Sequence, residues 1–155
     1  MKKILLLLLI VFMLFGCETQ EERIKREKDE KVEEITKELT SKEIPKDVQN
    51  WIVSTTLDKV ITVFCITTSK KCTEEKNIIE EIKTEYNVNM YYINVDEIPD
   101  ESKNIYKTTY DIEDYTGYLP YMLVTDSKEV ISTHTDMLKK EDFVNYLKEL
   151  KIISS

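Results

Sequence analysis

The sequence has 155 residues and a formal net charge of −8, from 30 acidic and 22 basic residues. This length suits one domain of ordinary size with an additional segment. The chain contains 2 glycines and 1 histidine, which excludes glycine-rich phosphate loops, dinucleotide-binding fingerprints and zinc sites built from several histidines. A net negative charge also argues against a nucleic-acid partner, because such partners need basic side chains that neutralise phosphates. The sequence therefore indicates no cofactor and no metal.

Residues 1–17 have the layout of a secretory signal peptide. Two lysines precede an apolar run over residues 4–15, which is about 18 Å long as a helix and too short for the ~30 Å hydrocarbon core of a bilayer. The run ends in Leu14-Phe15-Gly16-Cys17, which resembles the lipobox of bacterial lipoproteins. That resemblance implies cleavage after residue 16 and attachment of a lipid such as palmitate to Cys17. We therefore expect a lipid anchor at the extracytoplasmic face of the cell membrane. The alternative is a plain secretory leader with an ordinary Cys17.

Residues 17–46 have the composition of a charged tether. Between residues 21 and 42 most side chains are Glu or Lys, and the aliphatic ones form a thin stripe at helical spacing: Ile24, Val32, Ile35 and Leu39. Such a segment can be helical but buries little apolar surface. A helix that pairs with a coiled-coil partner is the alternative interpretation. We place the globular domain at residues 47–155.

The globular part alternates strand and helix patterns. A short helix capped by Asp47 precedes a buried strand over residues 60–66. Residues 71–86 follow helical spacing, and at ~100° per residue five side chains fall on one buried arc: Cys72, Ile78, Ile79, Ile82 and Tyr86. The later elements are a strand at 90–95, a helix at 105–110, strands at 121–125 and 129–133 joined by the turn 126–128, and a final helix from about 139.

The order β-α-β-α-β-β-α predicts an α/β domain with helices on both faces of a mixed sheet. Two crossover units should place three strands parallel, and the last two strands should form an antiparallel hairpin at the edge. The final helix should bury Phe143, Val144, Leu147 and Leu150.

In this order and spacing the chain resembles the thioredoxin superfamily over about residues 47–150, which implies a thioredoxin-like three-layer α/β/α fold. The family's reactive cysteine pair corresponds to Ser69-Lys70-Lys71-Cys72, and its cis proline corresponds to Leu119-Pro120-Tyr121. The resemblance implies that these residues lie together at a peptide- or protein-binding site. The same comparison extends to thioredoxin-like accessory proteins of bacteriocin export.

The chain also departs from this family. Ser69 replaces the nucleophilic first cysteine, and a hydroxyl cannot replace a thiolate in disulfide exchange. Val63 stands where thioredoxins have a buried carboxylate, and the segment 113–118 lengthens the loop before Pro120. The two-thiol cycle of thioredoxins is therefore not expected at position 69.

Cys65 and Cys72 are the cysteines of the globular domain. Cys72 is either a thiol activated by the helix N-terminus, Lys70 and Lys71, or a small apolar residue on the inner helix face. The implied fold brings Cys65 near Cys72, and an extracytoplasmic compartment favours a paired thiol. Such a disulfide would be either structural or a displaced redox pair.

The remaining candidates have plain structural interpretations. Ser69 is expected to cap its helix, and His134 is expected to be solvated or partly buried. Tyr115, Tyr118 and Tyr121 either form an aromatic surface around Pro120 or pack at the end of the sheet.

Three functions remain open at this stage. The first is a membrane-anchored thioredoxin-like protein, non-catalytic or weakly redox-active, that binds or assists a peptide or protein client. The second is a thiol-disulfide oxidoreductase of the bacteriocin-accessory type, active in cell redox homeostasis, with Cys72 alone or with Cys65 as its catalytic thiols. The third is a surface or immunity-type lipoprotein that uses the fold as a scaffold. The sequence indicates no oligomeric state.

Overall fold

The computed structural model describes residues 19–112 and 117–154. The leader, Cys17 and residues 113–116, including Tyr115, lie outside the described residues, so lipidation at Cys17 stays a prediction. The chain forms two compact units, Met1–Glu38 and Leu39–Ser155, and each is described by itself below.

The tether contains one long helix, α2 (Gln20–Ser41). Thr19 and Glu22 form a capping box, in which each backbone N–H donates to the other residue's side chain at 2.9 and 3.2 Å. Exposed Arg–Glu pairs one turn apart line the helix. In the described ranges, no helix combines the length and apolarity needed to cross a bilayer.

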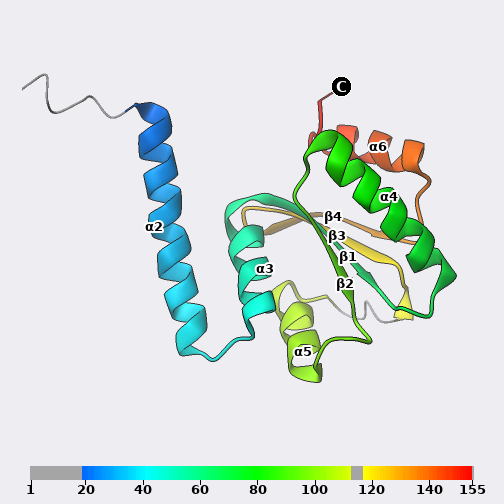
Figure 1. Cartoon of the computed structure of the whole chain (residues 1–155), viewed down its shortest axis with the longest axis horizontal. Coiled ribbons are helices and arrows are strands. Elements are labelled where there is room, and N and C mark those ends of the chain that lie inside the picture. The colour runs from blue at the N-terminus through cyan, green and yellow to red at the C-terminus, as the bar shows by residue number, and fades with distance from the viewer. Residues whose placement is uncertain (1–18, 113–116, 155) are drawn as a thin grey trace, which may run out of the picture. The chain divides into compact units, whose positions relative to one another are not determined.

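The second unit contains one mixed sheet with the strand order β2-β1-β3-β4. Its elements follow the predicted order β-α-β-α-β-β-α after one leading helix (Figure 1). They are α3 (Lys46–Leu57), β1 (Lys59–Cys65), α4 (Lys70–Tyr86), β2 (Met90–Asn94), α5 (Asp100–Thr109), β3 (Tyr121–Asp126), β4 (Glu129–Thr135) and α6 (Lys140–Glu149). The predicted α/β class and the mixed sheet are confirmed.

Helices cover both faces of this sheet, as Figure 1 shows: α4 and α6 lie on one side, and α3 and α5 on the other. The α4/α6 side buries Cys72, Ile79, Ile82, Phe143 and Leu147 against β1, β2 and β3. The other side centres on Trp51, whose indole N–H donates to Thr62 at 2.9 Å. The predicted inner face of α4 is confirmed, although Ile78 and Tyr86 are only partly buried, as are Val144 of α6 and Leu150 directly after it.

The predicted direction of the third strand is wrong. β1 and β2 are parallel, but β3 is antiparallel to β1. Tyr121, the first residue of β3, pairs with Phe64 next to the end of β1, which is also the end at which β2 stops. After the 10-residue α5 the chain enters β3 at the sheet end at which β2 stopped. The second connection is therefore not a parallel crossover.

Two local predictions also need correction. The cap of α3 is Pro45, with no side-chain hydrogen bond, and Asp47 lies inside the first turn. Proline suits this position because its fixed φ matches helix entry and a missing N–H costs nothing there. The β3–β4 hairpin has a two-residue loop, Ser127 and Lys128, because Asp126 still pairs with Glu129.

The second compact unit begins at Leu39, and the domain boundary at residue 47 stays a prediction. Leu39 is buried, and the Gln49 side chain of α3 donates to the Ile44 carbonyl at 2.6 Å. These contacts attach the end of the charged segment to α3.

Candidate functional site

The N-terminus of α4 is organised by Ser69. Its hydroxyl accepts a hydrogen bond from the Cys72 backbone N–H at 3.3 Å, and its carbonyl accepts one from Thr73 at 3.1 Å. Ser69 is therefore the N-cap of α4. A serine cap stabilises a helix by about 1 kcal/mol, which accounts for this residue without a catalytic role.

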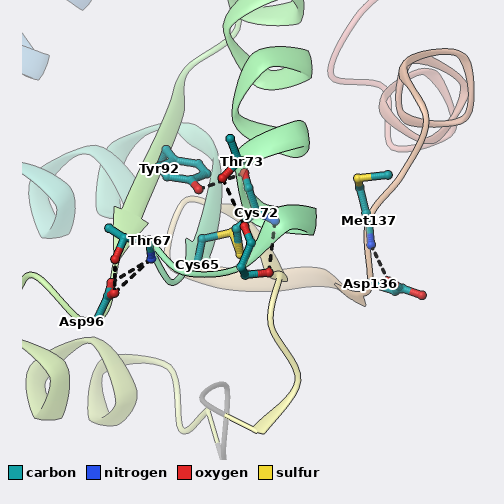
Figure 2. The surroundings of a disulfide bond; sticks show 9 residues. Cys65, Thr67, Cys72, Thr73, Tyr92, Asp96, Asp136 and Met137 are labelled. Carbon is teal, nitrogen blue, oxygen red and sulfur yellow. Dashed lines mark hydrogen bonds between the residues drawn. A yellow bond between two sulfur atoms is a disulfide. The ribbon is translucent and has the colours of Figure 1, made fainter.

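Cys65 and Cys72 form a disulfide in the structure (Figure 2). Cys65 is the last residue of β1 and Cys72 lies in the first turn of α4, with their Cα atoms 5.5 Å apart. The two residues are 0% and 1% exposed. The bond therefore ties the first turn of α4 to the sheet and leaves almost no sulfur surface for an incoming thiolate.

Pro120 lies at the same end of the sheet, and the predicted cis peptide Leu119–Pro120 is confirmed. The Pro120 carbonyl accepts a hydrogen bond from the Asp136 N–H at 3.1 Å. The Asp136 carboxylate in turn lies 2.5 Å from the Lys71 ammonium group. This chain of contacts joins the proline loop to the first turn of α4, as the resemblance implied.

The proline itself is buried, Leu119 and Tyr121 are partly buried, and Tyr118 is 69% exposed. The Tyr121 ring packs against Phe64, so it contributes to the core beside the site. Of the predicted aromatic surface, Tyr118 alone is a fully exposed ring among the described residues.

The two lysines of the site are paired with carboxylates. Lys70 lies 3.5 Å from Glu74, and the Lys71 hydrogen bond lowers the pKa of Asp136. Cys72 carries no thiolate while it is in the disulfide. The predicted activation of a free Cys72 by these lysines therefore describes only the reduced protein.

Glu75 is a feature that the sequence interpretation missed. It lies one turn after Cys72 on the same buried face of α4 and is 0% exposed. Neither carboxyl oxygen makes a hydrogen bond of ordinary geometry among the described residues, although the Leu138 backbone lies close enough to act as a donor. Burial raises the pKa of Glu75 to about 7, the nearby Leu138 backbone opposes this shift, and the charge of Asp136 adds to it. Beside the disulfide there is thus a carboxyl group that changes charge near neutral pH.

Tyr92 of β2 connects these groups. Its hydroxyl donates to the Cys72 carbonyl at 3.0 Å (Figure 2), and its position beside Val63 is fixed by the parallel pairing of β1 and β2. Burial raises the pKa of Tyr92, and the negative charge of Glu75 adds to that effect. Tyr92 therefore stays protonated and acts as a donor to the first turn of α4.

A contact between Thr67 and Asp96 joins the segments that follow the two parallel strands, β1 and β2. The Asp96 carboxylate accepts hydrogen bonds from the Thr67 N–H at 3.0 and 3.1 Å and from the Thr67 hydroxyl (Figure 2). The hydrogen bond from the Thr67 hydroxyl is the main reason that the pKa of Asp96 lies below its ordinary value. This contact holds the loop between Cys65 and Ser69 in place.

His134 lies outside this group of contacts. It is partly buried in β4, as predicted, and its ring centre is 5.9 Å from that of Tyr146. Across residues 19–112 and 117–154, no three His, Cys, Asp or Glu side chains gather in a way that could hold a metal ion.

No protein-family model matches the sequence, and no curated protein matches it either. Among solved structures, the domain is similar to oxidised thioredoxin O2 from Arabidopsis thaliana, with a TM-score of 0.50 and 15% sequence identity over 65% of this chain and 84% of that chain. A mutant thioredoxin from Halobacterium salinarum matches with a TM-score of 0.48 and 13% identity, covering 60% of this chain and 74% of that one. Thioredoxin-2 of a malaria parasite matches with a TM-score of 0.47 and 11% identity, covering 59% of this chain and 82% of that one.

The first of these matches establishes a thioredoxin-like fold over 65% of the chain, and at that identity it establishes the fold alone. The domain therefore has a thioredoxin-like fold, with a disulfide beside the N-terminus of α4.

Proposed function

We propose that the protein is a lipid-anchored thioredoxin-like protein at the extracytoplasmic face of the membrane, which binds a peptide or protein client and is at most weakly redox-active. One observation supports this most directly: the domain's two cysteines, Cys65 and Cys72, are joined and buried. Disulfide exchange needs an accessible sulfur and an attacking thiolate. The exposed start of α4 offers Ser69, a helix cap, in place of a thiol.

The client site in this proposal is the surface between α4 and the loop before β3. Tyr118 offers an exposed ring and Lys70 an exposed charge, while Pro120 and the Lys71–Asp136 contact fix the surface beneath them. An extended peptide can gain main-chain hydrogen bonds at such a sheet end and needs no cysteine for them.

A photo-reactive phenylalanine at position 118 is expected to form a discrete covalent adduct with the client in cells that carry the full-length chain. The ring at this position is 69% exposed and lies two residues before Pro120. Adduct mass on gels and by mass spectrometry is the measurement.

The matched control carries the same photo-reactive residue at Glu129. This position is also exposed, but it pairs with Asp126, at the sheet end opposite the Tyr121–Thr135 pair. Equal adducts from both positions, or none from position 118, would contradict the proposed client site.

The anchor in this proposal is a lipid on Cys17. We expect Cys17→Ser to move the protein from the membrane fraction to the soluble fraction, because the remaining apolar leader is short and the tether is highly charged. Membrane fractionation, with intact mass of the mature N-terminus, measures this. A variant that stays in the membrane, together with a wild-type N-terminus that carries no lipid, would rule the anchor out.

A thiol-disulfide oxidoreductase that uses the Cys65–Cys72 pair, of the bacteriocin-accessory type, is the second candidate. The observation that favours it is Glu75, a buried carboxyl with no hydrogen bond of ordinary geometry among the described residues, one turn from Cys72. Enzymes place such groups beside reacting atoms to move protons. Cys65→Ala or Cys72→Ala separates the candidates, because either change abolishes activity only if the pair is catalytic.

A further inference from the structure

Glu75 is an unusual residue for its position. The neighbouring acidic side chains of α4, such as Glu74 and Glu80, point to solvent, whereas Glu75 is 0% exposed within the apolar cluster between α4, α6 and the sheet. The Leu138 backbone faces the Glu75 carboxyl, but neither carboxyl oxygen makes a hydrogen bond of ordinary geometry. A buried carboxyl in this situation is unfavourable for folding whether it is charged or neutral. Leucine or methionine would fill the same place at no such cost. The packing therefore does not explain Glu75.

The groups around Glu75 all border the disulfide. Cys72 precedes it by one turn on the same face of α4, and side chains three residues apart on a helix are neighbours. From β2, Tyr92 contacts the Cys72 carbonyl and is influenced by the Glu75 charge. From the segment after β4, Asp136 and the backbone of Leu138 act on Glu75 directly.

The basic groups nearby are engaged elsewhere. Lys71 pairs with Asp136, and Lys76 lies over the Tyr92 ring, 5.5 Å from its centre. From α6, Lys140 pairs with Glu81 and Glu85 further along α4. His134 of β4 acts on Asp136. Glu75 thus has no cation beside it among the described residues, and its carboxyl can gain or lose a proton as the disulfide changes state.

We propose that Glu75 carries the proton of the Cys72 sulfur when the Cys65–Cys72 disulfide opens and closes. This inference rests on the weak redox exchange included in the proposed function, and it gives that exchange a proton carrier. In thioredoxins the comparable carboxylate belongs to the strand position that is Val63 here, whereas Glu75 approaches the cysteine from the helix.

The chemical step balances with a dithiol as reductant. The buried bond first becomes accessible by a local opening of the loop between Cys65 and α4. One thiolate of the dithiol then attacks the Cys65 sulfur, the S–S bond breaks, and its electron pair leaves on the Cys72 sulfur, which takes the proton of the Glu75 carboxyl. The mixed disulfide joins one dithiol sulfur to Cys65. The second thiolate of the same dithiol attacks that dithiol sulfur and releases the Cys65 thiolate, which takes a proton from solvent. The dithiol is oxidised to a disulfide, both cysteines are reduced, and Glu75 regains a proton from water. Oxidation by a disulfide follows the same path in reverse.

The test measures single-turnover reduction of the full-length chain by dithiothreitol from pH 5.5 to 8.5, with acid quench, alkylation and mass analysis. Each rate constant is divided by the concentration of dithiothreitol thiolate. In the wild type this normalised rate is expected to fall as pH rises through about 7, because only the protonated Glu75 can donate. Glu75→Gln, which keeps shape but cannot donate a proton, is expected to lower the normalised rate roughly ten-fold or more at pH 6 and to remove the inflection.

Glu80→Gln is the matched control, because Glu80 lies on the same helix but is exposed; it should keep the wild-type profile. A second measurement needs no variant: a carboxyl NMR titration should find different pKa values for Glu75 in the oxidised and reduced wild-type protein. If reduction depends on dithiothreitol concentration but Glu75→Gln keeps the wild-type pH profile, or if the Glu75 pKa does not change with redox state, the role of Glu75 is overturned. If reduction rates do not depend on reductant concentration at all, the disulfide opens only by unfolding, and both this inference and the weak exchange fail.

Discussion

Ser69→Cys is expected to convert the protein into a measurable thiol-disulfide exchanger, with an initial rate of insulin reduction by dithiothreitol roughly ten-fold or more above wild type. The side chain at position 69 is half-buried at the start of α4, where it accepts a hydrogen bond from the Cys72 backbone N–H. A helix N-terminus favours a negative charge and so lowers the pKa of a thiol placed there. The wild type, whose two cysteines are both buried, is expected to show negligible turnover.

The double variant Ser69→Cys/Cys65→Ala isolates the new pair, since Cys72 then has only position 69 as a partner. Ser69→Ala is the matched control: it loses the cap, and with it about 1 kcal/mol of stability, but gains no thiol and should stay inactive. The opposite outcome is a wild type that already reduces insulin, with Cys65→Ala or Cys72→Ala abolishing that activity. It would favour the second candidate, the oxidoreductase, over the proposed function. If neither Ser69→Cys nor Ser69→Cys/Cys65→Ala reduces insulin faster than the wild type, the start of α4 does not activate a thiol.

The fold could be predicted because its main elements carry local signals. The β-branched run at residues 60–65 and the apolar arc of residues 72–86 each have one clear periodicity. The direction of β3 has no such signal, because it depends on the sheet end at which the chain enters the strand rather than on the residues of the strand itself. The two-residue length of the hairpin loop also had no local signal. Ser127 and Lys128 both adopt positive φ, which is uncommon for residues other than glycine and is not expected from the sequence.

The candidate site was predictable in part. The spacing of Ser69, Cys72 and Pro120 located one end of the sheet, and the cis peptide followed from the resemblance. The pairing of Cys65 with Cys72 stayed open, since sequence spacing does not fix a distance between two cysteines. Contacts such as Thr67 with Asp96 join residues 29 positions apart, and no local pattern reveals them.

Glu75 could have been found. At ~100° per residue it falls in the middle of the arc defined by Cys72, Ile78 and Ile82, so the helical spacing already placed a carboxylate on the buried face of α4. Helical spacing identifies a buried face by its apolar residues. Glu75 is charged, so this criterion does not include it. A charged residue within an apolar arc is therefore a feature to record in its own right.

Glu75→Gln is expected to change how stability depends on pH. The pKa of Glu75 is about 7 in the folded chain and returns to its ordinary value, about 4.3, on unfolding, so the folded state binds the proton more tightly. The stabilisation from that proton is complete below pH 4 and is lost as pH rises through about 7; at ~1.4 kcal/mol per pKa unit the full loss amounts to about 4 kcal/mol, most of it above pH 5. Glutamine is neutral throughout and keeps its stability across this range.

The free energy of unfolding from urea titrations at pH 5, 6, 7 and 8, with the disulfide intact, measures this effect. The advantage of Glu75→Gln over wild type should grow by about 3 kcal/mol between pH 5 and pH 8. Asp96 and Asp136 do not disturb the comparison, because their pKa values are lowered by hydrogen bonds, so they titrate below this window in both proteins. Glu80→Gln should track the wild type at every pH. A constant difference between Glu75→Gln and wild type would mean that Glu75 is ionised at pH 5 and that its burial does not hold a proton, which would remove the physical basis for its role beside Cys72.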